Sequence, residues 1–525
     1  MTTLVHQIIE TSASAQSNAI AIKHKNKSWR YNDLSHQVHK VSQALLGIYL
    51  KHQQRVAVYL PKQIETVISF LSISQAGGVF VPVNPVLKAT QVSHILNDCN
   101  VHVLITSKSR LQSLTTQLKS CPDLHTIILV DENTPDISVD QQVMAWPDFL
   151  NQANNQTMPK LIDTNMAAIL YTSGSTGKPK GVVLSHQNII AGAESVAEYL
   201  NIQAEDKTLA VLPFSFDYGL NQLISSLLKG ATCVLLDYLL PRDVIKAIEK
   251  HRITGLAAVP PLWAQLSKIE WPTPINEHLR YMTNSGGKMP KSVLDTIRSK
   301  VPDSQFYLMY GLTEAFRSTY LPPEQLDLRP DSMGKAIPNA EVLVVREDGS
   351  LCAPHEPGEL VHIGSLVAMG YWNDPEKTAE RFKPAPRQLK ELPLTEIAVW
   401  SGDQVSIDEE GYLYFVGRKD DMLKTSGYRV SPTEIEEVIY STGLVKEAAA
   451  IGIPHDTLGQ VIIVVVCVDH FEQFDETELI QQCKTQLANF MVPAKIIALA
   501  ELPKNPNGKI DRKNLVSQFS NILPT

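Results

Sequence analysis

The sequence predicts an α/β fold with a large N-terminal domain followed by a small α+β C-terminal domain. Three observations lead to this prediction. Short apolar strands alternate with amphipathic helices over about the first 160 residues, the alternation resumes near residue 167, and from about 340 it changes to short β-runs separated by Gly and Pro. Because strands that alternate with helices form parallel sheets covered on both faces, we expect two parallel-sheet α/β subdomains and a small β-rich subdomain in the N-terminal domain.

The first subdomain is indicated by three apolar runs and one periodic segment. Strands are expected at 56–60, 79–83 and 101–106, and an amphipathic helix at 64–76. The polar stretch 134–165 is expected to be an irregular connection across the surface.

The second subdomain repeats the pattern further along the chain. We expect strands near 167–171, 208–212 and 231–236, and helices near 187–199 and 241–250.

A last change of pattern follows Arg418. A helix at 432–440, a strand from Val461 and a helix near 476–488 predict a separate α+β unit. The domain boundaries are therefore predicted as 1–418 and 419–525. At about 150 residues per unit, a chain of 525 residues has room for roughly two to four compact units.

Composition excludes several classes of function. The 47 Lys and Arg against 55 Asp and Glu give a net charge of −8, which argues against binding nucleic acid. No apolar run approaches the roughly 18 residues of a membrane span, and the N-terminus does not resemble a signal peptide. The six cysteines are scattered without a C-x-x-C pair, which is typical of a reducing compartment. We expect a cytoplasmic enzyme that binds neither nucleic acid nor membranes.

The strongest local motif is the loop 171–181, with the sequence YTSGSTGKPKG. Its glycines permit close backbone approach, its hydroxyls and amides can donate to phosphate oxygens, and its lysines offset negative charge. It is not a Walker loop, because Gly174 and Gly177 are too close together and Pro179 follows Lys178. The alternative interpretation is a flexible surface turn.

This loop resembles the signature of the adenylate-forming superfamily, which contains acyl-CoA synthetases, luciferases and the adenylation domains of peptide synthetases. Four further segments resemble the family's other motifs, in the family's order: YGLTE at 310–314, WSGD at 400–403, GRKDDMLKTSGYRVSPTEIE at 417–436 and NGKIDR at 507–512. Five motifs in the same order make chance agreement negligible. The resemblance implies ATP and Mg²⁺ as cofactors and an AMP-forming acid–thiol ligase.

The resemblance also implies a nucleotide site. Thr313 offers a hydroxyl for the α-phosphate and Glu314 a hard oxygen ligand for magnesium. Tyr310 can stack on adenine, unless it is an ordinary core aromatic, and Asp403 can accept from the ribose hydroxyls, unless it is a turn residue. The residues expected to bind ATP or AMP are Thr172, Ser173, Gly174, Ser175, Thr176, Gly177, Lys178, Lys180, Gly286, Gly287, Tyr310, Gly311, Asp403, Arg418 and Arg429.

The catalytic step is assigned by resemblance to Lys509. It would bridge the substrate carboxylate and the α-phosphate, although an exposed lysine near a terminus is usually only solvated. In this family the C-terminal domain rotates after adenylate formation. We expect the hinge at Asp420, whose alternative is a plain charged turn, and the tunnel for the thiol at Gly427.

The segment 212–223 (LPFSFDYGLNQL) bears on which acid is activated. Its Phe216–Asp217 pair resembles amino-acid-activating domains, in which the Asp holds the substrate ammonium. The alternative is an Asp217 paired with a protein donor, since a buried carboxylate needs a partner. Arg317 is expected near the pocket, where it would bind a second carboxylate or pair with an acid outside it. The expected substrate-binding residues are Phe216, Asp217, Tyr218, Asn221, Met309 and Arg317.

The whole pattern resembles stand-alone enzymes that activate L-proline for a separate carrier protein, as in anatoxin-type pathways. The chain ends soon after Lys509 without a pantetheine attachment context, so transfer to a stand-alone carrier with a phosphopantetheine arm is expected. The stretch around Arg317 also resembles certain acyl-CoA ligases, so an acyl-CoA ligase is the rival within the superfamily. A non-catalytic nucleotide-binding scaffold is the alternative from another class.

Overall fold

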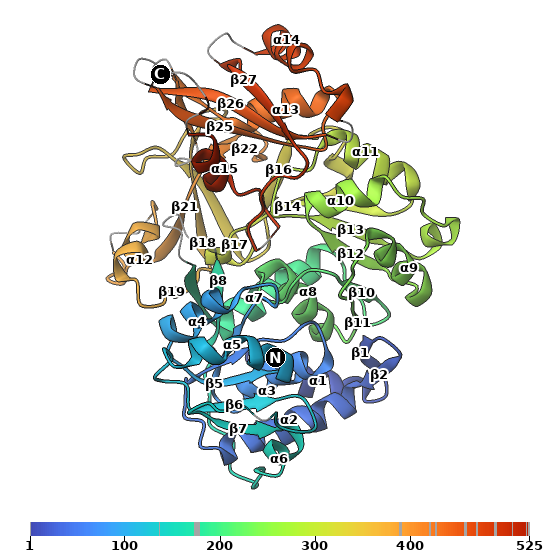
Figure 1. Ribbon diagram of the computed structural model, residues 1–525, viewed down its shortest axis with the longest axis vertical. Helices are drawn as coiled ribbons and strands as arrows, with labels where there is room; N and C mark the ends of the chain where they lie inside the picture. The colour runs from blue at the N-terminus through green and yellow to red at the C-terminus, as the bar shows by residue number, and fades with distance from the viewer. Residues whose placement is uncertain are drawn as a thin grey trace.

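The computed structural model has three β-sheets covered by helices (Figure 1). It describes residues 2–522 apart from 136, 173–178, 388–390, 419–421, 426–427, 456–458, 469–470, 488–490, 507 and 521. Two large sheets form the N-terminal part and a five-stranded sheet forms the C-terminal part. The α/β class expected from the sequence is confirmed.

The first sheet has eight strands, and its central strands are parallel. In spatial order they are β19 (Gly370–Tyr371), β9 (Lys180–Ser185), β8 (Met166–Thr172), β4 (Val79–Pro82), β3 (Arg55–Val58), β5 (Val101–Thr106), β6 (Thr126–Leu129) and β7 (Gln142–Ala145). Its helices are α2 (Tyr31–Gly47), α3 (Ile64–Gln75), α4 (Ala89–Asp98), α5 (Lys108–Leu118) and α6 (Trp146–Leu150). The predictions for 56–60, 64–76, 79–83 and 101–106 are confirmed to within two residues.

The prediction of an irregular segment at 134–165 was wrong in part. This segment contains β7, which pairs in parallel with β6, and the short helix α6. The strand lies at the edge of the sheet, has only four residues and buries only Ala145, so it gives a weak signal in the sequence. Its pairing partner, and not its own composition, makes it a strand.

The second sheet has fourteen strands. Its parallel part comprises β14 (Gln305–Tyr310), β13 (Tyr281–Asn284), β12 (Gly255–Ala258), β10 (Lys207–Ala210), β11 (Thr232–Leu235) and β1 (Ile20–His24), with β2 (Lys27–Arg30) antiparallel at the edge. Its helices are α1 (Gln7–Gln16), α7 (His186–Tyr199), α8 (Asp217–Leu228), α9 (Pro241–His251), α10 (Pro260–Ser267) and α11 (Lys291–Lys300).

The β-rich segment continues this second sheet. Strand β16 pairs with β15 on one side and β22 on the other, which joins the antiparallel strands to the parallel ones. The antiparallel strands are β15 (Thr319–Leu321), β16 (Ser332–Ala336), β22 (Leu413–Arg418), β21 (Ile397–Ile407), β18 (Gly358–Gly364), β17 (Ala340–Val345) and β20 (Phe382–Pro384), with α12 (Pro375–Arg381) beside them.

The third sheet contains β23 (Leu423–Thr425), β24 (Tyr428–Val430), β25 (Glu447–His455), β26 (Gly459–Cys467) and β27 (Lys495–Leu499). Helices α13 (Pro432–Ser441), α14 (Glu476–Gln486) and α15 (Arg512–Phe519) accompany it. Among the described residues, 3-10 turns are found at η1 (Thr273–Glu277), η2 (Thr313–Ala315), η3 (Pro323–Gln325) and η4 (Phe471–Gln473). The change of sheet falls between β22 and β23, near the predicted boundary. The predicted hinge Asp420 lies outside the described residues.

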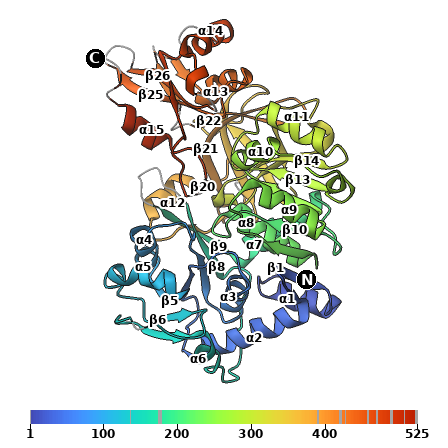
Figure 2. The ribbon, with the colours of Figure 1, turned by 45° about the vertical axis from the view of Figure 1, so that its right-hand side comes forward.

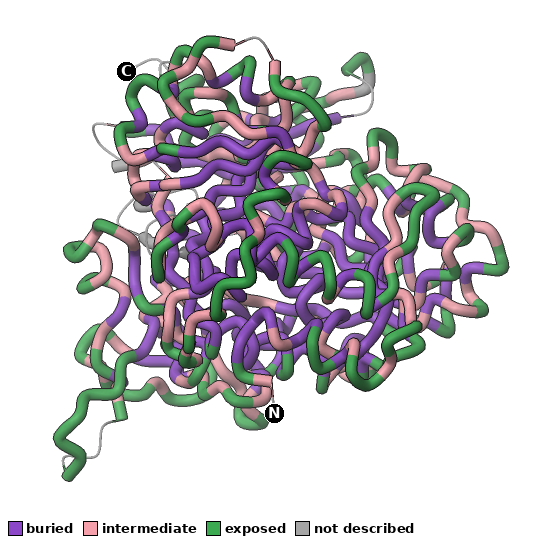
Figure 3. Tube along the Cα trace, turned by 90° about the horizontal axis from the view of Figure 1, so that it is seen from below, coloured by how far each residue is buried: buried purple, intermediate pink, exposed green. Residues whose placement is uncertain are grey.

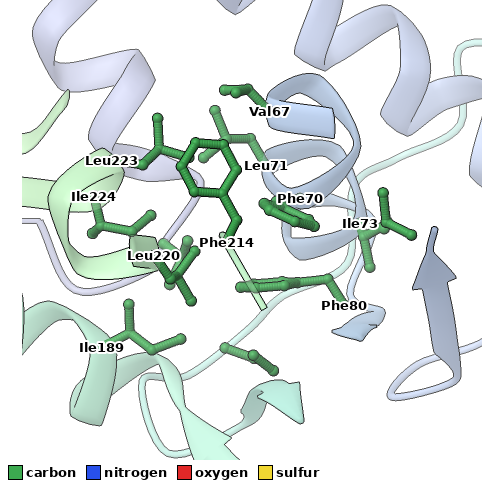
Figure 4. Close-up of a cluster of buried hydrophobic side chains, with 14 of the residues drawn as sticks. Val67, Phe70, Leu71, Ile73, Phe80, Ile189, Phe214, Leu220, Leu223 and Ile224 are labelled. Atoms are coloured by element: carbon green, nitrogen blue, oxygen red, sulfur yellow. The ribbon is translucent and has the colours of Figure 1, made fainter. Parts of the chain in front are cut away.

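Apolar side chains join the two large sheets into one body. Phe214, which precedes α8, packs against Phe70 of α3 with ring centroids 6.3 Å apart, and Phe70 stacks on Phe80 at 5.0 Å (Figure 4). Leu220 and Leu223 of α8 lie in the same cluster. This packing supports the start of α8, the helix that begins with Asp217.

The buried residues concentrate on the strands and the inner helix faces, while the exposed ones follow the outer loops (Figure 3). In the part of the chain that the structure describes, no helix has the length and apolarity to cross a bilayer.

Candidate active site

A cleft of about 2460 Å³ lies between the two large sheets of the N-terminal part and the C-terminal sheet. Strands β12, β13 and β14 are parallel neighbours, so their carboxyl ends meet at one edge of the sheet. The loops that follow these strands line the cleft, together with the start of α8, part of β21 and the segment after β27. Ligands of open α/β sheets bind at such an edge. In Figure 2 the C-terminal sheet lies above this edge.

Gly286 lies where three parts of the predicted site meet. Its φ of +83° is in the region that favours glycine. A Cβ added there would lie 3.6 Å from Cζ of Phe216 and 3.7 Å from Cε of Lys509. The nucleotide glycine, the predicted acid pocket and the predicted catalytic lysine are therefore in van der Waals reach of one point.

Asp217 is the first residue of α8 and is 3% exposed. Its Oδ1 accepts a hydrogen bond from Oγ1 of Thr313 at 3.3 Å, and its Oδ2 lies 3.5 Å from Nη1 of Arg317. Burial raises the pKa of Asp217, although the charges of Arg317 and Lys509 lower it in part. Arg317 therefore offsets only part of the cost of burying the carboxylate.

Arg317 is almost fully buried and contacts the pocket acid itself. Its guanidinium carbon lies 4.5 Å from the centre of the Tyr218 ring, a cation–π geometry. Its Nε and Nη2 have no hydrogen-bond partner among the described residues. The acid that pairs with Arg317 among the described residues is Asp217, and the binding of a second substrate carboxylate by Arg317 stays a prediction.

Of the other expected substrate-binding residues, two line the cleft and two are buried within α8. Phe216 and Met309 line the cleft, and Met309 accepts a hydrogen bond from the Tyr199 hydroxyl at 2.9 Å. Tyr218 and Asn221 are buried within α8. The Tyr218 hydroxyl lies 2.5 Å from that of Thr283, and Oδ1 of Asn221 accepts from Ser225 at 3.2 Å.

Glu314 lies in η2, the turn after β14, and forms a partly buried cluster with Lys180 and Tyr371. Lys180 Nζ lies 3.1 Å from Oε1 of Glu314 and 2.6 Å from the Tyr371 hydroxyl, which donates to the same Oε1 at 2.6 Å. Burial alone would raise the pKa of Glu314, but the Lys180 charge and the Tyr371 hydrogen bond lower it below its ordinary value. Glu314 is therefore held as a carboxylate, the form that binds a metal ion.

Sequence reasoning did not identify Tyr371. It lies in the two-residue strand β19, whose pairing with β9 brings it beside Lys180. Burial and the nearby Glu314 raise the pKa of Tyr371, so the hydroxyl remains protonated and donates. No local pattern marks this residue, because its partners are remote in sequence.

We expect Tyr371→Phe to raise the apparent KM for MgATP about tenfold. The change removes one charge-assisted hydrogen bond to Glu314, a contact of roughly 1.5–3 kcal/mol. Steady-state kinetics at varied ATP would measure it, with Tyr412→Phe, a tyrosine outside the cleft lining, as the control. An unchanged KM would show that Glu314 does not depend on the hydroxyl.

The structure brings together two residues of the predicted adenosine site, Tyr310 and Asp403. The Tyr310 hydroxyl donates to Oδ2 of Asp403 at 2.5 Å, and both residues line the cleft. Arg418 lies opposite Asp403 in the β21–β22 register.

Thr172 lines the cleft as well, and its Oγ1 is buried without a partner among the described residues. The remaining predicted phosphate-loop residues (Ser173, Gly174, Ser175, Thr176, Gly177 and Lys178), together with Asp420 and Gly427, lie outside the described residues, as do the side chains of Arg418 and Arg429.

Lys509 lies on a tight hairpin between β27 and α15. Lys504 and Ile510 form a β-bridge at its base. In Figure 1 this dark-red segment descends from the C-terminal sheet toward the body of the molecule. Its position agrees with the contact of Lys509 at Gly286.

Comparison with known proteins identifies the family. A family model described as AMP-binding enzyme matches residues 9–372, and one described as AMP-binding enzyme C-terminal domain matches 434–509. One linear gramicidin synthase polypeptide of Brevibacillus parabrevis is 30% identical over 514 residues, which is 97% of this chain and 6% of that protein. A long-chain-fatty-acid–CoA ligase of Bacillus subtilis is 28% identical over 544 residues, covering 98% of this chain and 94% of that protein.

Solved structures agree in fold. ATP-bound MatB from Rhodopseudomonas palustris has a TM-score of 0.87 at 24% identity, covering 99% of this chain and 100% of that one. The o-succinylbenzoate CoA synthetase of Bacillus subtilis in complex with the acyl-adenylate intermediate OSB-AMP has a TM-score of 0.83 at 25% identity, with 97% of each chain covered. Since the family model alone spans more than half of the sequence, this chain belongs to the AMP-binding enzyme family, part of the adenylate-forming superfamily.

Proposed function

We propose that the protein activates L-proline as prolyl-adenylate and transfers the prolyl group to the phosphopantetheine thiol of a separate carrier protein. The observation that carries this proposal is the buried carboxylate of Asp217. Burial raises its pKa more than the charges of Arg317 and Lys509 lower it, so a further cation from the substrate would stabilise the ionised form. A secondary ammonium offers that charge and two N–H donors. The compact ring of proline suits the apolar wall formed by Phe216 and Met309.

ATP and Mg²⁺ are the cofactors of this reaction. The unpartnered Thr172 hydroxyl at the start of the predicted phosphate loop suits a phosphate oxygen, and the Glu314 carboxylate suits magnesium. Magnesium would offset phosphate charge when bound. We assign Tyr310 and Asp403 to the adenosine and Gly286 and Gly287 to close backbone approach. The six cysteines are scattered along the sequence without a C-x-x-C pair, which supports the cytoplasmic location that we propose.

The proposed chemistry has two steps. The substrate carboxylate attacks the α-phosphorus of ATP and pyrophosphate leaves. The thiol sulfur then attacks the acyl carbon, forms the thioester and releases AMP. Lys509 would offset the charge that develops on the phosphate in the first step. Rotation of the C-terminal domain about Asp420 would then bring the Gly427 segment toward the thiol.

An AMP-forming acyl-CoA ligase is the second candidate. The contact between Arg317 and Asp217 favours it, because a guanidinium already pairs in part with the carboxylate expected to hold the ammonium. A fatty-acid–CoA ligase among the relatives matches over nearly its whole length. A non-catalytic scaffold is the third interpretation. The convergence of Lys509, Glu314 and Asp403 on one cleft speaks against it.

ATP–pyrophosphate exchange over a panel of acids tests the proposal. The panel contains L-proline, other amino acids, medium-chain fatty acids and dicarboxylic acids. We expect exchange with L-proline above all others. Exchange with a fatty or dicarboxylic acid alone would support the acyl-CoA ligase, and ATP binding without exchange would support the scaffold.

A further inference from the structure

A hydrogen bond crosses from the N-terminal part to the hairpin that carries Lys509. Asn84 follows β4, lines the cleft and is 5% exposed. Its Nδ2 donates to the carbonyl oxygen of Pro506 at 3.0 Å. Pro506 lies on the same hairpin, three residues before Lys509.

The local turn sets the direction of this donor. Oδ1 of Asn84 accepts from the backbone N–H of Val86 at 3.1 Å, and its carbonyl accepts from the N–H of Leu87 at 3.1 Å. The first bond is the Asx-turn geometry, in which the side-chain oxygen is bound to the backbone two residues on. With the oxygen held in this way, the amide nitrogen faces Pro506.

The hairpin itself is closed by Asn505. Its Oδ1 accepts from the N–H of Lys509 at 3.0 Å, its N–H donates to the Lys509 carbonyl at 2.7 Å, and its carbonyl accepts from Gly508 at 2.9 Å. Because these bonds tie Lys509 to the rest of the turn, a contact at Pro506 places the whole turn, including the Lys509 backbone.

A second bridge crosses the cleft from the loop after β13. Nζ of Lys288 lies 3.2 Å from Oδ1 of Asp331 in the N-terminal part and pairs with Glu437 of α13 in the C-terminal part. Lys288 follows Gly287 directly, so this ion pair is adjacent to the predicted nucleotide glycines. Any rotation of the C-terminal domain has to break both this bridge and the Asn84 hydrogen bond.

We infer that Asn84 is a positioning residue for Lys509, and that Asn84 and Lys288 together hold the C-terminal domain in its adenylate-forming orientation. The kinetic part of this inference rests on the two-step function proposed above, but it does not depend on which acid is activated. Asn84 acts through the hairpin and does not touch the reacting atoms.

Two substitutions of Asn84 distinguish its hydrogen bond to Pro506 from its role in the local Asx-turn. Asn84→Asp keeps the oxygen that accepts from Val86 but removes the donor and places a second oxygen opposite the Pro506 carbonyl. Asn84→Ala removes both contacts. We expect Asn84→Ala to slow pyrophosphate exchange about three- to tenfold, the effect of one lost hydrogen bond, and Asn84→Asp to slow it more. Thioester formation from supplied acyl-adenylate should change less than about twofold, since this step does not need Lys509 at the phosphate.

Lys288→Ala tests the second contact. It should slow exchange about two- to threefold, because partly exposed ion pairs are weak, and Lys288→Arg should restore the rate. Arg298→Ala is the matched control. It breaks an exposed pair with Asp327 that lies wholly within the N-terminal part, so exchange should stay at the wild-type rate.

Hydrogen exchange of the backbone amides at 504–510 gives a readout that needs no substrate. Asn84→Asp should increase exchange there relative to wild type, while the Val86 amide stays protected. This result would support the positioning role even if no acid in the panel were activated. Equal loss in both half-reactions, or unchanged pyrophosphate exchange together with unchanged protection at 504–510, would overturn the inference.

Discussion

Replacement of Lys509 by alanine should reduce ATP–pyrophosphate exchange by about 10²- to 10³-fold, the usual cost of losing a charge-stabilising group at the reacting centre. The structure places this lysine beside Gly286 and close enough to Asp217 to lower its pKa in part. Transfer to the thiol from supplied prolyl-adenylate should remain comparatively intact, because the lysine serves the first step. Rapid-quench measurement of each half-reaction would show the difference.

The control for this prediction is Lys484→Ala, which removes an exposed lysine of α14 in the same domain. Its two half-reaction rates should match those of wild type. If Lys509→Ala slowed both half-reactions equally, the assignment of Lys509 to adenylation alone would be wrong.

Replacement of Asp217 by alanine should remove most activity on L-proline. By the same logic, wild type should barely activate cyclopentanecarboxylate, which has nearly the shape of proline but lacks its nitrogen. A ligand without that nitrogen leaves the buried carboxylate without its substrate cation. We expect a cost of about 3 kcal/mol, the lower end of the range for broken buried pairs, because Arg317 still offsets part of the charge. Since 1.4 kcal/mol is about tenfold, discrimination should reach about 10² or more. Pyrophosphate exchange with both acids, on wild type and variant, measures it.

The protonation state of Asp217 adds a pH dependence to this prediction. Burial raises its pKa, and only the ionised carboxylate accepts from and balances an ammonium. The KM for L-proline should therefore rise as pH falls toward that pKa, and Asp217→Asn should abolish this dependence. Strong wild-type exchange with medium-chain fatty acids, and none with any amino acid, would contradict the assignment and favour the acyl-CoA ligase.

Sequence patterns alone predict the α/β class, some of the strands and helices of the N-terminal part, and the motifs of the family. These features are local. An apolar run such as 101–106 indicates a strand through its own composition, and a motif such as 310–314 carries its chemistry in adjacent residues. The same locality explains why β7 was missed, since this edge strand has only four residues and depends on its pairing with β6.

The order of the strands in the two large sheets and the contacts within the site depend on the tertiary structure. Strands β1 and β2, from the first 30 residues, complete the second sheet, whereas β8 and β9 return to the first. The partners of Asp217, the donation from Tyr371 to Glu314, and the bond from Asn84 to the hairpin of Lys509 link residues about 60 to more than 400 positions apart. Such contacts form when strands pair into sheets and when the two domains pack together. Because neither event produces a periodicity or a fixed spacing in the sequence, these contacts could not be predicted from it.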